Sequence, residues 1–189
     1  MTVGVKIGSE RPPHAANSEV SLEAIYREHA AFVWRTLRRL GVREADVSDV
    51  SQEVFLAVHR HRHAYDPEVA PVRAWLVGFA RRAASDYRRR AHVRREALDA
   101  ILTEGRVEPV QDRELELRRR RALLDRALEE LDEDKRVAFV LYELEEMPLA
   151  EIAAAMGAPL QTIYSRLQAA RSQVEASVRR ALAVGRSRS

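Results

Sequence analysis

The chain lacks cysteine altogether, and this absence excludes several kinds of site. Without thiols there can be no disulfide framework, no thiolate-bound metal and no cysteine nucleophile. The longest apolar runs are far shorter than the roughly 20 residues that span a bilayer, and the N-terminal segment has no apolar signal-peptide core. We therefore expect a cytoplasmic protein with no membrane insertion.

Glycine and proline are also scarce, with seven of each among 189 residues, and no long alternating run of β-branched residues occurs. Apolar residues make up 46% of the chain and charged residues 32%, a balance typical of helices with one buried and one solvated face. The length allows one large domain or two small ones. The predicted fold class is therefore all-α.

The spacing of apolar residues divides the chain into two small helical domains joined by a linker. Gly105, Pro109 and mixed charges interrupt the helical pattern and mark the linker, which we expect to leave the domains free to move. The predicted segments are a disordered leader (1–18), a first helical domain (19–96), the linker (97–113), a second domain of four helices (114–182) and a flexible tail (183–189).

Lysine is nearly absent too, since Lys6 and Lys135 supply only two of the 32 Lys and Arg residues. Arginine offers planar, bidentate donors suited to phosphates and guanine edges. Seven arginines gather in residues 81–95 against a single acid, Asp86. Such a run can be a solvated helix face, but like charges repel one another unless an anion relieves them. We interpret this stretch as a candidate surface for nucleic acid.

Two aromatic residues, Trp75 and Tyr87, share the predicted helix with these arginines. Aromatic rings among arginines can stack on unpaired bases while the guanidinium groups hold phosphates. Trp75 also falls on the apolar stripe of the helix, so a core position is at least as good an interpretation.

The preceding predicted helix, residues 46–60, is acidic. It carries Asp49, Gln52 and Glu53 beside Phe55. The acids could simply favour the positive end of the helix dipole, or they could form a docking face for a basic partner helix. The spacing alone supports both interpretations.

A helix-turn-helix pattern covers residues 149–171. Apolar residues at helical spacing mark a first short helix, Gly157 and Pro159 interrupt it, and a second apolar stripe begins at Ile163. Gly157 can adopt the positive φ that a tight turn requires. Outward positions of the second helix would face a DNA major groove.

Little in the sequence supports catalysis or metal binding. There is no Gly-rich phosphate loop and no credible Ser/His/acid set, and the pairs Glu129-Glu130 and Glu145-Glu146 are best interpreted as helix surface. His59 and His63 have a spacing that can hold a metal on a helix, but nearby arginines disfavour it. We expect no enzyme, no metal and no cofactor.

The sequence blocks of the two predicted domains together resemble a bacterial RNA polymerase sigma factor of the extracytoplasmic-function class, within the sigma-70 family. The first domain carries YREHAAFVWRTLRRLG (26–41), ADVSDVSQEVFLAVHRH (45–61) and VRAWLVGFARRAASDYRRR (72–90). The second carries LEELDEDKRVAFVLYELEEMPLAEIAAAMGAPLQTIYSRLQAAR. The likeness covers about residues 21–182, and the linker is too short for a third sigma domain, which favours the small class.

The resemblance implies three contacts. The acidic helix would dock on the β′ clamp helices of core polymerase through Asp49, Gln52, Glu53 and Phe55. The arginine-rich helix would bind the melted minus-ten promoter element through Arg81, Arg82, Asp86, Tyr87 and Arg89. The helix-turn-helix would read the duplex minus-35 element through Gln161, Thr162, Tyr164, Ser165, Arg166 and Arg171.

The same resemblance implies further partners. They are the β flap of polymerase and an anti-sigma factor that buries both domains, and the free chain is expected to be a monomer. Val72, Arg82 and Tyr164 depart from the residues common in the family, which leaves the base preferences open.

Two rival functions remain at this point. One is a homodimeric DNA-binding regulator that works without polymerase. The other is a protein-interaction decoy with sigma-like domains that no longer engages DNA. Substituting Arg81, Arg82 and Arg89 by Ala would stop transcription by a sigma factor and leave a decoy's partner binding intact.

Overall fold

The computed structural model describes residues 21–98 and 112–186, and no strand occurs in them. The first domain contains α1 (Leu22–Arg39), η1 (Glu44–Asp46), α2 (Val47–His61), η2 (Arg62–Ala64) and α3 (Val72–Leu98). The second contains α4 (Asp112–Glu129), α5 (Glu133–Phe139), the π-helical turn η3 (Val140–Leu144), α6 (Leu149–Met156) and α7 (Leu160–Arg186). The all-α prediction is confirmed for these residues. The predicted leader (1–18) and most of the predicted linker lie outside them.

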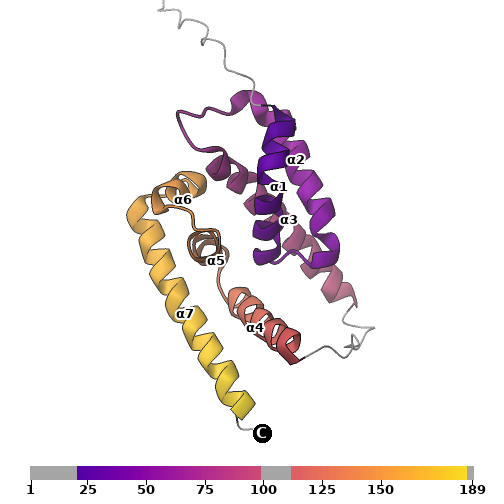
Figure 1. Cartoon of the computed structure of the whole chain (residues 1–189), viewed down its shortest axis with the longest axis vertical. Coiled ribbons are helices and arrows are strands. Elements are labelled where there is room, and N and C mark those ends of the chain that lie inside the picture. The colour runs from indigo at the N-terminus through magenta and orange to yellow at the C-terminus, as the bar shows by residue number, and fades with distance from the viewer. Residues whose placement is uncertain (1–20, 99–111, 187–189) are drawn as a thin grey trace, which may run out of the picture.

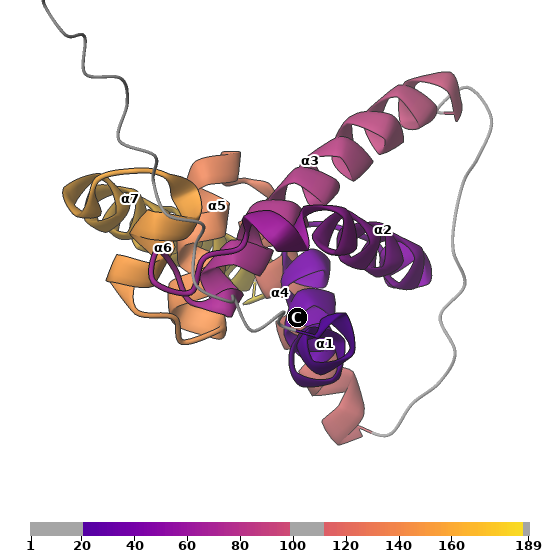
Figure 2. The same cartoon turned by 90° about the horizontal axis from the view of Figure 1, so that it is seen from above.

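The first domain is built on the apolar stripes of α1, α2 and α3. Val33 and Leu37 of α1, Val58 of α2 and Leu76 and Val77 of α3 are fully buried against one another in its core. Burying such side chains stabilises a fold by roughly 1.5–3 kcal/mol each relative to leaving them exposed. Both views place these helices on one side of the molecule and α5, α6 and α7 on the other (Figures 1 and 2).

The bounds of α2 follow the prediction, but its cap does not. The helix predicted over residues 46–60 is α2, which ends at His61, before Asp66-Pro67, and is followed by the 3₁₀ turn η2. Asp46 occupies the N-cap position of α2 but makes no capping hydrogen bond. Its carboxylate instead accepts hydrogen bonds from Arg43 and Tyr87.

Capping and turn residues of the second domain follow the sequence signals closely. The Asp132 carboxylate accepts a 2.9 Å hydrogen bond from the Lys135 backbone N–H at the start of α5. These contacts hold the pKa of Asp132 below its ordinary value, chiefly through hydrogen bonding to Lys135. Gly157 ends α6 in the left-handed conformation (φ 58°), as the turn of a helix-turn-helix requires.

The two domains pack against each other. Their buried residues, from Leu37 and Leu76 in the first domain to Leu141, Ile152 and Ile163 in the second, belong to one hydrophobic cluster. This contact between the domains was not predicted from the sequence. The covalent link was the only connection that the sequence pattern could show, whereas the contact is made by residues about 50 to 110 positions apart.

Candidate nucleic-acid and polymerase interfaces

The acidic face of α2 is exposed. Asp49, Gln52 and Glu53 face solvent, whereas Phe55 is 7% exposed and packs edge-to-face against Tyr26 with ring centroids 4.9 Å apart. Leu56, 61% exposed, lies seven residues after Asp49 and so on the same helix face. Leu56 is therefore an exposed apolar residue of this surface, whereas the nearly buried Phe55 packs against Tyr26, which is itself 55% exposed.

Leu56 was absent from the predicted docking residues although its spacing carried a signal. Its seven-residue spacing from Asp49 places it on the polar face rather than on the stripe of buried valines. An exposed large apolar residue among acids is what a protein-docking surface contains, because it can be desolvated by a partner.

The proposed minus-ten residues do not all lie on one free surface. Arg82 and Arg89 are exposed on α3, and Arg89 forms an ion pair with Asp86 one turn earlier. Tyr87 is half-buried, and its hydroxyl donates a 2.5 Å hydrogen bond to Asp46. Arg43 donates to both groups, and its pKa is raised by its hydrogen bonds to Tyr87 and then Asp46.

Arg81 points toward the second domain instead. Its guanidinium group lies 3.1 Å from the Glu133 carboxylate and 2.7 Å from that of Asp134. Arg88 and Ser85 of the same helix also contact Glu133, at 2.8 Å and 3.0 Å. Together with Arg166, these residues form what we call the Glu133–Asp134 cluster.

Burial by itself raises the pKa of the Glu133 carboxyl, and this is the largest single effect on it. The hydrogen bonds from Arg81 and Ser85 and the charge of Arg88 outweigh that effect. The pKa of Glu133 therefore lies below its ordinary value, and the group is ionised at neutral pH.

Trp75 adopts the core position that its spacing allowed. It is half-buried between Tyr65 and Phe79, with ring centroids 4.8 Å and 5.1 Å away. Burial of Tyr65, followed by the nearby charge of Asp66, raises the pKa of its hydroxyl. This aromatic group packs against the hydrophobic core at the end of the domain near η2.

The helix-turn-helix consists of α6 and the first turns of α7. Gln161, Tyr164 and Ser165 are exposed, and Thr162 is half-buried. Arg166 is engaged within the fold, 2.5 Å from Asp134. Arg171 contacts two residues, since its guanidinium group lies 2.5 Å from the Glu143 carboxylate and 5.3 Å from the Tyr142 ring centroid.

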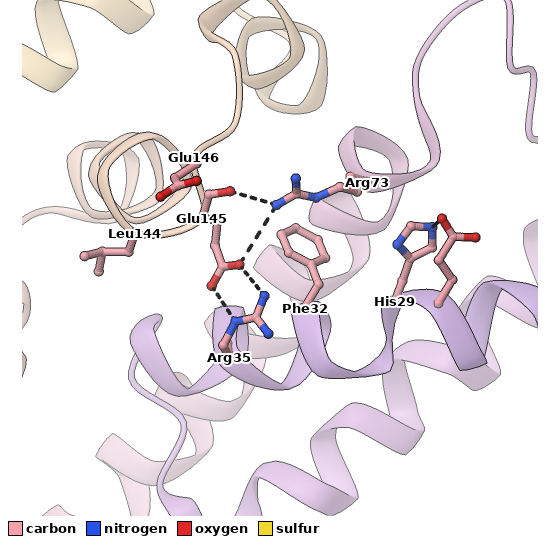
Figure 3. Close-up of a pocket in the computed structure, with 8 residues that line it drawn as sticks. His29, Phe32, Arg35, Arg73, Leu144, Glu145 and Glu146 are labelled. Atoms are coloured by element: carbon pink, nitrogen blue, oxygen red, sulfur yellow. Dashed lines mark hydrogen bonds and ion pairs between the residues drawn. The ribbon is translucent and has the colours of Figure 1, made fainter.

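Glu145 is a functional candidate that sequence analysis placed wrongly. Its side chain is 1% exposed rather than on a helix surface. Arg35 donates to the carboxylate at 3.0 Å and 3.3 Å, and Arg73 donates to the Glu145 carbonyl at 2.8 Å (Figure 3). Arg39 also binds the carboxylate. We call these four residues the Glu145 cluster.

A surface cavity of about 460 Å³ lies beside this cluster, between α1, α3 and the end of η3 (Figure 3). It is lined by Glu28, His29, Phe32, Arg35, Arg73, Leu144, Glu145 and Glu146. Within residues 21–98 and 112–186, no group of three or more potential metal ligands occurs. No helix in the same ranges is long and apolar enough to cross a membrane.

Taken together, these features define a two-domain helical DNA-binding protein. An acidic docking helix and an arginine-rich helix share the first domain, and a helix-turn-helix forms the second. Comparison with known proteins then gives the family. Residues 25–95 match Sigma-70 region 2, and residues 121–174 match Sigma-70, region 4.

Curated proteins with similar sequences are RNA polymerase sigma factors as well. SigL of Mycobacterium tuberculosis, an ECF RNA polymerase sigma factor, is 32% identical over 81% of this chain and 86% of its own length. The ECF RNA polymerase sigma-E factor of Escherichia coli is 31% identical over 72% and 76% of the two chains. SigE of Mycolicibacterium smegmatis is 32% identical over 82% of this chain, which spans only 60% of that protein.

Two solved structures match the chain in fold. CnrH in complex with the cytosolic domain of CnrY matches with a TM-score of 0.61 and 26% identity, over 82% of this chain and 85% of that one. The sigma factor RpoE of Bartonella quintana, in complex with the anti-sigma factor NepR, matches in fold with a TM-score of 0.64 and 19% identity, over 83% and 96%. The chain belongs to the extracytoplasmic-function sigma factors of the sigma-70 family. Sigma factors are transcription initiation factors and not enzymes.

Proposed function

We propose that this chain directs core RNA polymerase to a set of promoters in the cytoplasm, with a separate surface for each task. The observation that carries this proposal is the exposure of two chemically different surfaces. One is the acidic face of α2, which ends at the exposed Leu56, and the other is the polar face of α7 formed by Gln161, Tyr164 and Ser165.

The acidic face would dock on the β′ clamp helices, with Asp49, Gln52 and Glu53 making polar contacts and Phe55 and Leu56 making apolar ones. Charged rims of this kind steer association, and a desolvated apolar centre supplies affinity. The second domain would meet the β flap. Before docking, the free chain is expected to be a monomer.

The arginine-rich helix would hold the melted minus-ten strand, with Arg82 and Arg89 on phosphates and Arg81, Asp86 and Tyr87 near the bases. Phosphate contacts by arginine give affinity that falls with salt, while base contacts specify sequence. The helix-turn-helix would read the minus-35 duplex through Gln161, Thr162, Tyr164 and Ser165. Arg166 and Arg171 flank that surface.

An anti-sigma factor is the proposed regulator. The solved structure of the Bartonella quintana sigma factor holds such a protein, which supports the idea by analogy of fold. For this chain, a purified candidate that blocks its binding to core polymerase would establish the partner.

The test is transcription in vitro with purified chain, sigma-free bacterial core polymerase and fragments of the source genome, with transcript starts mapped. Starts that need this chain and share upstream elements support the proposal. Binding to core without transcription would point to a decoy. Failure to bind core would overturn the proposal and favour a polymerase-independent regulator.

A further inference from the structure

The side of α7 that faces away from the core carries no charge over its first three turns. Five exposed side chains follow this side of the helix, and we call them the outward face of α7: Leu160, Gln161, Tyr164, Ser165 and Gln168. Ile163 and Leu167 are buried in the core instead, so the packing of the domain fixes which side chains the helix presents. The outward face therefore offers two amides, two largely apolar groups and one aliphatic hydroxyl.

The arginines of this segment are engaged by acids of their own domain. Arg166 is the only charged residue among residues 160–168, and its guanidinium group lies 2.5 Å from the Asp134 carboxylate of α5. The guanidinium group of Arg171 lies 2.5 Å from the Glu143 carboxylate of η3. Each of these pairs would have to break before its arginine could bind a base edge.

The chemistry of the outward face does not suit guanine. In the major groove guanine offers two acceptors, N7 and O6, and the commonest specific partner for them is the cationic donor pair of an arginine or lysine. The outward face has no such cation. Its hydroxyl is also partly used, because Ser165 donates a 3.0 Å hydrogen bond to the Gln161 carbonyl of its own helix.

Adenine and thymine match the outward face instead. The adenine edge combines an acceptor, N7, with a donor, the N6 amino group, and a glutamine amide supplies the complementary donor and acceptor. Gln161 and Gln168 both present such amides. The thymine edge carries a C5-methyl group, which apolar side chains contact. Leu160, 53% exposed, and the ring of Tyr164 provide the apolar surface for it.

The spacing of the two glutamines sets the length of DNA that this face can read. Gln161 and Gln168 are seven residues apart in the sequence, which is about 10.5 Å along a helix axis. Successive bases of a strand rise by about 3.4 Å. A helix that follows the groove therefore brings the two amides to bases about three steps apart, and Leu160 and Tyr164 lie near the first of them.

We propose that the outward face of α7 selects a minus-35 element made of A·T pairs over about four base pairs. Adenines would lie opposite Gln161 and Gln168, and thymine methyl groups would lie against Leu160 and Tyr164. The inference rests on the proposed function, and it adds Leu160 and Gln168 to the residues of the minus-35 surface.

The first test keeps the wild-type chain and varies the DNA. Holoenzyme assembled from this chain and sigma-free core is given templates with a randomised minus-35 element upstream of a mapped transcript start, and the transcribed templates are sequenced. We expect A·T pairs to be selected at about four consecutive positions. The positions read by α7 are those whose selection changes with Gln161→Ala or Gln168→Ala. G·C pairs selected there, or no change with either variant, overturn the inference.

Base analogues then remove one chemical group at a time from the selected element. Deoxyuridine in place of thymine lacks the C5-methyl group, and 7-deazaadenine lacks the N7 acceptor. Binding of holoenzyme to labelled promoter DNA, followed by fluorescence anisotropy, should weaken about fivefold for a lost N7, the lower end of what one bidentate contact supplies. A lost methyl group should weaken it about fourfold, the value of one buried methylene. Equal effects from the same analogues in the spacer, or none in the element, overturn the inference.

Variants assign each contact to its side chain. Gln161→Ala and Gln168→Ala should each remove the sensitivity to 7-deazaadenine at one position, and Leu160→Ala and Tyr164→Ala should each reduce the sensitivity to deoxyuridine. Gln173→Ala, exposed farther along α7, is the matched control and should keep every sensitivity. Unchanged sensitivities in all four variants overturn this inference alone. A chain that directs no transcription with core overturns the proposed function.

Discussion

The hydroxyl of Tyr87 donates a 2.5 Å hydrogen bond to the carboxylate of Asp46, and this bond joins the arginine-rich helix α3 to the start of the acidic helix α2. The two proposed binding surfaces of the first domain are therefore fixed relative to each other. A rigid relation suits a protein that must place a melted strand at a set position on polymerase.

Tyr87→Phe removes this donor and leaves Asp46 with its 2.7 Å contact to Arg43. We expect the free energy of unfolding to fall by about 1 kcal/mol, the usual net value of one hydrogen bond. Urea unfolding followed by circular dichroism measures it. An unchanged unfolding midpoint would show that the bond contributes nothing to the domain.

Gly41 is the glycine whose conformation matters most to the fold. Its φ is 95°, and a Cβ there would stand 3.4 Å from both Arg136 and Arg88, which is ordinary contact. Gly41→Ala should therefore destabilise the chain by about 1–2 kcal/mol through backbone strain alone. Gly78→Ala is the matched control, since Gly78 lies within α3 with open space around it. This control should stabilise the helix by about 0.5–1 kcal/mol. Equal changes in the free energy of unfolding of the two variants would contradict the assignment of backbone strain to Gly41→Ala.

Stability should depend on Glu133 in acid. Its folded pKa lies below its unfolded value, despite the opposing effect of burial, because Arg81, Ser85 and Arg88 favour the ionised carboxyl. The contribution is therefore complete above the unfolded pKa and is lost as pH falls through the folded pKa. Glu133→Gln should lower the unfolding midpoint at pH 7 and reduce its fall between pH 7 and acid pH. Glu175→Gln, at an exposed pair within α7, should leave the profile unchanged.

Leu56→Ala should weaken binding to core polymerase without loss of stability. An exposed apolar side chain contributes much to the binding free energy only when a partner desolvates it. Its truncation then costs more than about 1 kcal/mol of that free energy. Leu182→Ala, at another exposed leucine, serves as control. Equal affinities for core in a fluorescence binding assay would remove Leu56 from the docking surface.

Tyr164→Ala should change recognition of the minus-35 duplex and leave folding intact, because the ring is 49% exposed. Loss of one good base contact costs about 1–3 kcal/mol of discrimination. The ratio of affinities for promoter duplexes with intact and altered minus-35 elements measures it. Gln173→Ala, farther along α7, should keep the wild-type ratio.

The sequence predicts the helices and their turns because these depend on local chemistry. The apolar spacing locates α1 and α3, the Asp132 side chain caps α5, and Gly157 provides the left-handed turn. The family could also be predicted, because several sequence blocks stand in the order and at the separations that are typical of it.

The domain interface could not be predicted in this way. Glu145 lies 110 residues from Arg35, and a surface position is the natural interpretation of a glutamate in a polar pair. Its burial follows from the π-helical turn, which shifts the register of the helix by one residue and which no residue type announces. Likewise, Phe55 and Leu56 are adjacent, and only the folded structure shows that Phe55 joins the hydrophobic core while Leu56 stays exposed.

The most direct test of the central claim is strand opening at a promoter identified by the mapped transcript starts. Permanganate modifies unpaired thymines, so it reports whether holoenzyme containing this chain melts the minus-ten element. We expect reactive thymines near minus ten only when chain and core are both present, and loss of that reactivity with Arg82→Ala plus Arg89→Ala. Equal reactivity with core alone, or none with the holoenzyme, would contradict the account.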